Sequence, residues 1–277
     1  MKKLLVISVL TISLVACKDS ATRKAEEGKE LAATFAPIIN GAWVMTDYIN
    51  HLGNSKSPLA SYNLLKDVVS MNINTADYSG DSLYVPISIN NHEGDGFMVY
   101  FRKGHDENSL PTSLPDYQNS INSYELGYEV KEKDTFLVLY HYGANNKLLD
   151  KRSFSKIPPA SEDGEPNALQ RAVNSLLFAG SYSATNEQGI VADVTFTADG
   201  LLQGIDGHNT FYIFTDFMAE EDGYKIDEIC FDERTKNQQP FIFAISGDTT
   251  RLYAAKENEE RTRLEKGALK YTLVKKK

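Results

Sequence analysis

The stretch VADVTFTADGLLQGI, residues 191–205, decides the fold. Val191–Thr197 and Leu201–Ile205 are short, apolar and rich in β-branched residues, and Asp199-Gly200 lies between them. An Asp-Gly pair between two such runs is a strong signal for a β-hairpin, because both residues tolerate the positive φ of a tight turn. The segment therefore predicts two antiparallel strands joined by a close turn.

The same alternation of short strands and turns continues along most of the chain. Turn signals at Gly143–Asn146 and Ser246–Thr249 predict two further hairpins. The other predicted strands are Leu83–Ile89, Phe97–Phe101, Phe136–Tyr142, Arg152–Ile157, Thr210–Phe217, Lys225–Phe231, Phe241–Ile245, Arg251–Ala255 and Lys270–Val274. Because Pro86 lacks an N–H, its strand is predicted to be an edge strand or to carry a bulge. This rhythm favours antiparallel barrels or sandwiches over alternating strands and helices.

Helices are predicted at only a few places. Tyr62–Asp67 and Asn167–Leu177 are the two expected inside the body of the protein. Residues 18–36 are polar and charged, and we expect a tether there that becomes helical only near Leu31–Phe35. Thr210–Phe217 is apolar on both faces, so this strand is expected to be covered on both sides.

The chain predicts two small β-domains of similar design. Residues 158–167 contain three prolines and three acidic residues, which favour a linker over a sheet. Gly41-Ala42-Trp43 opens the part before the linker, and Gly180-Ser181-Tyr182 opens the part after it. We therefore expect an internal duplication, with antiparallel barrel or sandwich domains at residues 37–157 and 168–277. One continuous β-sandwich is the alternative.

The first residues indicate export. Met1-Lys2-Lys3 is basic, and Leu4–Ala16 is an apolar run shorter than the ~20 residues of a membrane-spanning helix. This pattern predicts a signal peptide at residues 1–16. Leu14-Val15-Ala16-Cys17 resembles the lipobox of bacterial lipoproteins. The resemblance implies cleavage before Cys17 and its acylation with fatty acids such as palmitate, and two attached lipids are enough for stable anchoring. An ordinary secretory peptide with a chance cysteine is the alternative.

Two further features resemble lipoproteins of Bacteroidetes. Lys18-Asp19-Ser20 partly matches their surface-export signal, which implies an outer-membrane anchor followed by a lipidated tether at residues 17–36. The face of the membrane, outer or periplasmic, stays open. Gly41-Ala42-Trp43 resembles the Gly-x-Trp start of lipocalin-like barrels, in which the Trp closes the barrel base. The whole pattern is similar to lipocalin-like lipoproteins of this group, and it implies a fold and a location but no catalytic residue.

Charge and cysteine content exclude several classes of protein. Loss of residues 1–16 would remove two lysines and no acid, and would change the formal charge from −9 to −11. Such an acidic body argues against nucleic-acid partners and against adsorption on anionic lipid. Membrane contact is therefore expected only through Cys17. Once Cys17 is acylated, Cys230 has no partner in the same chain, and we expect it to be a buried, inert thiol.

The histidines give no catalytic signature. Gly-x-Ser-x-Gly, His-Glu-x-x-His and Gly-x-Gly-x-x-Gly are absent from the sequence, so we predict no catalytic residue, metal site or cofactor. His92 and His105 flank one predicted strand, whose ends lie roughly 20 Å apart, and the turns around them are expected to be solvated. His141 is expected on the strand face opposite its two tyrosine neighbours. His51 and His208 have no visible partner in the sequence.

The leading functional prediction is a non-catalytic binding or accessory lipoprotein of the cell envelope. Its partner would be a small apolar ligand, a glycan or an envelope protein. Aromatic residues on strands are the weak candidates for binding: Trp43, Tyr100, Tyr140 and Tyr212. An envelope hydrolase of the glycosidase kind is one alternative, since its paired carboxylates cannot be located from a sequence. A structural subunit of an outer-membrane assembly is the other.

Overall fold

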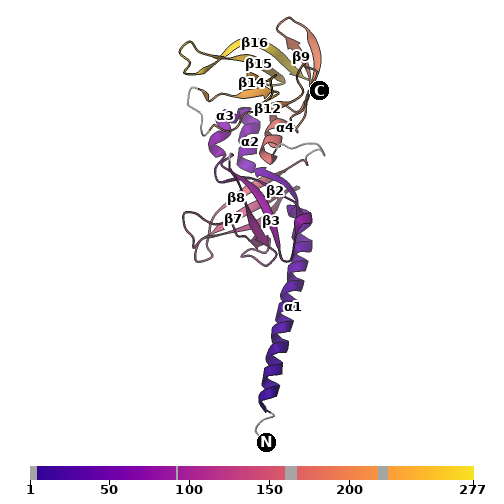
Figure 1. The fold of residues 1–277 in the computed structure, drawn as a ribbon, viewed down its shortest axis with the longest axis vertical. Coiled ribbons are helices and arrows are strands. Elements are labelled where there is room, and N and C mark those ends of the chain that lie inside the picture. The colour runs from indigo at the N-terminus through magenta and orange to yellow at the C-terminus, as the bar shows by residue number, and fades with distance from the viewer. Residues whose placement is uncertain (1–4, 92, 160–166, 218–223) are drawn as a thin grey trace. The chain divides into compact units, whose positions relative to one another are not determined.

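The computed structural model describes residues 5–91, 93–159, 167–217 and 224–277, and side chains from Thr22 onward (Figure 1). The helices are α1 (Leu5–Ile39), α2 (Thr46–Ser55), α3 (Pro58–Ser61), η1 (Tyr62–Leu64), η2 (Thr75–Asp77) and α4 (Ala168–Leu177). Among the described residues, no helix is both long and apolar enough to span a bilayer.

The strands form two antiparallel sheets. The first contains β1 (Gly41–Met45), β2 (Val68–Ile73), β3 (Ser82–Ile89), β4 (Glu93–Tyr100), β5 (Ser109–Pro111), β6 (Ser123–Lys131), β7 (Asp134–Tyr142) and β8 (Leu148–Ile157). The second contains β9 (Gly180–Asn186), β10 (Val191–Phe196), β11 (Leu202–Gln203), β12 (Phe211–Ile213), β13 (Glu228–Phe231), β14 (Gln239–Ser246), β15 (Thr249–Glu257) and β16 (Leu264–Lys275). The chain is therefore mainly β, as the sequence predicted.

Both sheets follow one up-and-down order. In the first sheet the order is β4-β3-β2-β1-β8-β7-β6-β5, and in the second it is β11-β10-β9-β16-β15-β14-β13-β12. Nearly every strand pairs with the next one along the chain, and the first strand of each set pairs with the eighth. A bridge between Val99 and Thr112 approaches closure of the first sheet, and a bridge between Leu201 and Thr210 does the same for the second. Such closure produces a barrel-like shape and removes exposed sheet edges.

The chain divides into two compact units. Unit 1 comprises residues 1–41, 72–86 and 96–153, and unit 2 comprises residues 42–71, 87–95 and 154–277. These units are interleaved along the sequence, so the boundaries at residues 37–157 and 168–277 stay a prediction. Most of the expected linker, residues 160–166, lies outside the described residues.

The predicted turns are confirmed, and so is one predicted helix. Gly200 adopts a φ of +84° in the turn between β10 and β11, where the Thr197 amide donates to the Leu201 carbonyl. The turns at Gly143–Asn146 and Ser246–Thr249 likewise join β7 to β8 and β14 to β15. Helix α4 closely matches the prediction for Asn167–Leu177.

Other helix predictions were wrong. Helix α2 was not predicted, because it begins directly after β1 without a side-chain cap and contains Gly53, a poor helix former. The helix expected at Tyr62–Asp67 is only the single turn η1. Helix α1 extends far beyond Leu31–Phe35. Strand β3 lies between β4 and β2, so the strand of Pro86 is not an edge, and the irregularity in its pairing with β2 places the extra residue, Val69, on β2.

A glycine with positive φ opens each sheet. Gly41 has a φ of +121° and Gly180 a φ of +138°, and each directly starts the first strand of its sheet after a helix. A side chain at either position would strain the backbone. This requirement explains why the first strand of each sheet starts with a glycine.

Substitution of these glycines tests that explanation. Gly180→Ala is expected to lower the free energy of unfolding by about 2 kcal/mol, because alanine disfavours this φ. Gly53→Ala is the matched control: no atom lies within 4 Å of its added Cβ, and alanine in the α2 helix should stabilise by about 0.5–1 kcal/mol. Urea denaturation of both variants measures the two effects. Equal stability of Gly180→Ala and the wild type would contradict the account.

The core of the second sheet is filled by aromatic rings. Ring centroids in this cluster lie 4.9–6.2 Å apart, the range in which aromatic pairs attract. The cluster consists of Phe178, Tyr182, Phe196, Phe211, Phe231, Phe241 and Phe243, each at most 5% exposed. The rings contact one another across five strands of the sheet, so they pack as a solid core.

Strand β12 is shorter than predicted, and only one face of its segment is fully covered: Phe211, Ile213 and Phe217 are buried, whereas the other face, with Tyr212 and Phe214, is half-buried. Ile213 ends β12, and its carbonyl accepts a hydrogen bond of 3.2 Å from Gln170 Nε2 of α4. The Phe217 ring lies 5.5 Å from the Tyr62 ring of η1. Helices of the same compact unit therefore provide the cover.

Helix α1 packs against the rest of unit 1 along its last three turns. Gly28, Ala32, Phe35 and Ile39 are buried, and their spacing places them on one helix face. The Phe35 ring meets Tyr128 of β6 edge-on at 5.5 Å. The end of the expected tether is thus a docked helix and is not a free chain.

Candidate functional site

The four predicted binding aromatics are divided between the two compact units. Trp43 and Tyr212 belong to unit 2, and Tyr100 and Tyr140 belong to unit 1. Trp43 is fully buried beneath the Lys156 ammonium, which lies 5.3 Å from its ring centroid, and Tyr140 is only 7% exposed. Cys17 lies in α1, but its side chain is outside the described part.

The densest polar cluster of unit 1 surrounds Glu125 of β6. This carboxylate is 2% exposed. It accepts the His105 amide at 2.9 Å, the His105 Nδ1–H at 2.5 Å and the Ser109 hydroxyl at 2.5 Å. Gly104 permits this approach, because a Cβ there would lie 2.4 Å from the Glu125 carboxylate. Residues 105–108 are exposed, as expected of a solvated turn, but the sequence did not reveal that Glu125 holds this turn.

The cluster holds the His105 ring in one orientation. Since Nδ1 donates to Glu125, the neutral ring keeps its lone pair on Nε2. The ring centroid lies 4.6 Å from that of Tyr142, and burial, together with Glu125 and Asp106, raises the pKa of the Tyr142 hydroxyl. A histidine fixed in this way by a carboxylate resembles general bases and metal ligands in its local chemistry.

No complete catalytic arrangement accompanies His105 in the described part of the chain. The Ser109 hydroxyl donates to Glu125 and not to the imidazole, so the serine is not activated by the histidine as a nucleophile requires. Within the same described residues, no group of three histidines, cysteines or carboxylates is placed to hold a metal ion. The cluster as it stands orders the loop between β4 and β5.

A second cluster surrounds His141 on the opposite face of β7. Its Nε2 lies 3.0 Å from Asp116 Oδ2, and its Nδ1 lies 2.9 Å from Asp150 Oδ2. The ring stacks on Tyr124 at 4.4 Å between centroids. Tyr140 and its second neighbour Tyr142 stack on each other on the other face, so the predicted alternation of this strand is confirmed.

The remaining histidines have partners that the sequence did not reveal. His208 Nδ1 lies 2.8 Å from Asp232 Oδ2, and His51 Nδ1 lies 2.9 Å from Ser61 Oγ. The expectation that neither has a partner was wrong. His92 lies outside the described residues.

Unit 2 contains a buried polar pair of its own. The Tyr48 hydroxyl is buried without a hydrogen-bond partner, the one such side-chain atom among the residues described. Burial raises its pKa, and the neighbouring Asp227 adds to the effect. Burial also raises the pKa of Asp227, whose Oδ1 accepts the Leu59 amide at 2.9 Å. This carboxylate ties the α3 turn to the segment before β13.

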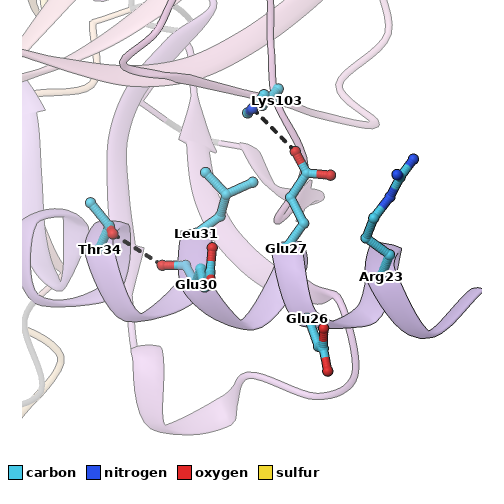
Figure 2. Close-up of a pocket in the computed structure, with 7 residues that line it drawn as sticks. All are labelled: Arg23, Glu26, Glu27, Glu30, Leu31, Thr34 and Lys103. Carbon is cyan, nitrogen blue, oxygen red and sulfur yellow. Dashed lines mark hydrogen bonds and ion pairs between the residues drawn. The ribbon is translucent and has the colours of Figure 1, made fainter. Parts of the chain in front are cut away.

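A shallow groove of about 560 Å³ runs along α1 beside Lys103. Figure 2 shows Glu27 pointing toward Lys103, at 3.4 Å, while Glu26 points away. The Lys103 side chain is 78% exposed, so this ion pair contributes little. The other lining residues are Arg23, Glu30, Leu31 and Thr34. The groove is an open, charged seam without a buried polar group to orient a ligand.

Comparison with known proteins adds no relative. No family model, no curated protein and no solved structure matches this chain.

Proposed function

We propose that the protein is a lipid-anchored lipoprotein of the outer membrane that acts as a non-catalytic binding or accessory module. The observation that supports the modular part of the proposal is the repeated eight-strand order, in which each sheet starts at a glycine of positive φ, while the anchor is proposed from the residues around Cys17. This is the arrangement expected of two lipocalin-like barrels that arose by internal duplication. Helix α1 would connect the lipid on Cys17 to the body and hold it at a defined distance.

The filled core of the second sheet argues against one kind of partner, a small apolar ligand. A small apolar ligand needs a cavity, and the aromatic cluster occupies the space where such a ligand would lie. The buried carboxylates Glu125 and Asp232 accept hydrogen bonds from neighbouring segments of the chain, which leaves them poorly suited to glycoside hydrolysis. An envelope protein bound at the surface is therefore the partner we favour.

Acylation of Cys17 tests the anchor. Cells that express the wild type and grow with labelled palmitate are expected to yield a labelled protein in the membrane fraction. The Cys17→Ser variant should carry no label and should no longer appear in the membrane fraction. Cys230→Ser is the matched control and should keep them, because that thiol is buried. A labelled Cys17→Ser protein would exclude this anchor.

Native mass spectrometry of the detergent-solubilised full-length protein tests the binding mode. We expect the mass of the acylated chain alone, and cross-linking in whole cells should yield a defined protein adduct. A stoichiometric small molecule retained by the protein would contradict the preference for a protein partner.

A further inference from the structure

The His141 cluster joins two segments that are distant in sequence. Asp116 lies in the connection between β5 and β6, and Asp150 lies in β8. Both carboxylates contact the same imidazole, one at each ring nitrogen. The His141 side chain is 12% exposed and that of Asp116 is 8% exposed, while that of Asp150 is 62% exposed. The imidazole therefore links a buried acid to an exposed one.

This geometry depends on the charge of the imidazole. A carboxylate only accepts hydrogen bonds, so both contacts are hydrogen bonds only if both ring nitrogens carry a proton. Such charge-assisted bonds are stronger than neutral ones. Loss of one proton turns a donor into a lone pair that faces a carboxylate, and one of the two contacts becomes repulsive. Histidine is the side chain whose charge changes within the physiological pH range.

Asp116 also orders the loop that follows it. Its Oδ1 accepts the Gln118 amide at 2.8 Å and the Asn119 amide at 3.2 Å, and its Oδ2 accepts Asn122 Nδ2 at 2.7 Å. These bonds, the one from Asn122 first, lower the pKa of Asp116 to about 2. A lowered pKa means that this contribution to stability is present above the unfolded value near 4 and is lost as the pH falls toward 2. Asp116 therefore stays charged at neutral pH.

The loop held in this way displays two large apolar side chains. Tyr117 is 78% exposed and Ile121 is 69% exposed. The charged or titratable groups that face His141 are Asp116 from the loop, Asp150 from β8 and Tyr124 from β6. Arg152 follows Asp150 by two residues and lies on the same face of β8.

We propose that His141 is a pH-dependent latch for the loop at residues 116–122: its protonated ring clamps the loop against β8, and its deprotonation releases the loop together with the exposed Tyr117 and Ile121. The proposal does not depend on the lipid anchor or on the partner proposed above.

Hydrogen exchange on the full-length protein tests the latch. After correction for intrinsic rates, peptides that cover residues 114–123 are expected to exchange at least tenfold faster at pH 8 than at pH 5. His141→Gln should abolish this difference in exchange rate between pH 5 and pH 8. His208→Gln is the matched control in unit 2 and should retain the difference. Equal protection of the wild-type loop at both pH values, or a pH step that persists in His141→Gln, would overturn the proposal.

Asp150→Asn provides a second test that does not require a core substitution. Its side chain is 62% exposed, so the variant should fold normally. Loss of this negative charge destabilises the charged imidazole, and the midpoint of the exchange step should move to lower pH. An unchanged midpoint would contradict the latch.

Discussion

Replacement of Phe196 by alanine is expected to lower the free energy of unfolding by about 3–5 kcal/mol, the usual cost of removing a buried phenylalanine side chain. Its ring is 1% exposed and contacts four other rings: Phe178 at 5.4 Å, Tyr182 at 5.6 Å, Phe211 at 5.0 Å and Phe231 at 6.2 Å. Because these rings form one cluster, the cavity left by the substitution cannot be filled by a local shift. Urea denaturation monitored by fluorescence measures this decrease in the free energy of unfolding.

Tyr117→Ala is the control for this prediction. It also removes an aromatic ring, but that ring is 78% exposed, so its loss should change stability by no more than about 0.5 kcal/mol. If Phe196→Ala were as stable as Tyr117→Ala, the second sheet would have a loosely filled interior. A cavity for a small ligand would then again be the favoured interpretation of the protein.

Local chemistry in the sequence predicted many of the strands and turns, but not β2, β5 or β6. The turn at Asp199-Gly200 needs a positive φ, and the residues around it alternate in a way that only a strand satisfies. The strand Ser123–Lys131 was not predicted, although it pairs with β7 over its whole length. Its glutamates and Gly127 lower its β-propensity, and pairing with a strongly apolar neighbour compensates for them.

The clusters around the histidines could not be predicted, for a different reason. Glu125 is twenty residues from His105, and Asp116 is twenty-five residues from His141. Each contact forms only because β5, β6 and β7 lie side by side, so it depends on register, which a single sequence does not reveal. The alternation along β7 was the one usable signal. It placed His141 on its correct face but could not identify the two acids beside it.

Glu125→Ala is expected to destabilise unit 1 by about 3 kcal/mol, the second-largest effect among the substitutions considered. Removal of the carboxylate leaves the buried Ser109 hydroxyl and the partly buried His105 amide and Nδ1–H without their acceptor. Glu125→Gln keeps one acceptor oxygen, so its loss should be smaller. Urea denaturation gives the two values, and hydrogen exchange of residues 103–109 should show faster exchange in Glu125→Ala.

Glu107→Ala is the matched control, because Glu107 is an exposed acid in the same loop and its removal should change stability very little. The two outcomes distinguish a structural cluster from a site held ready for a ligand. If Glu125 orders the loop between β4 and β5, its removal gives a large loss of stability and faster exchange in that loop. A near-neutral Glu125→Ala would instead mean that the cluster is strained in the free protein, as groups held for a ligand often are. His105 would then become the first residue to test for binding.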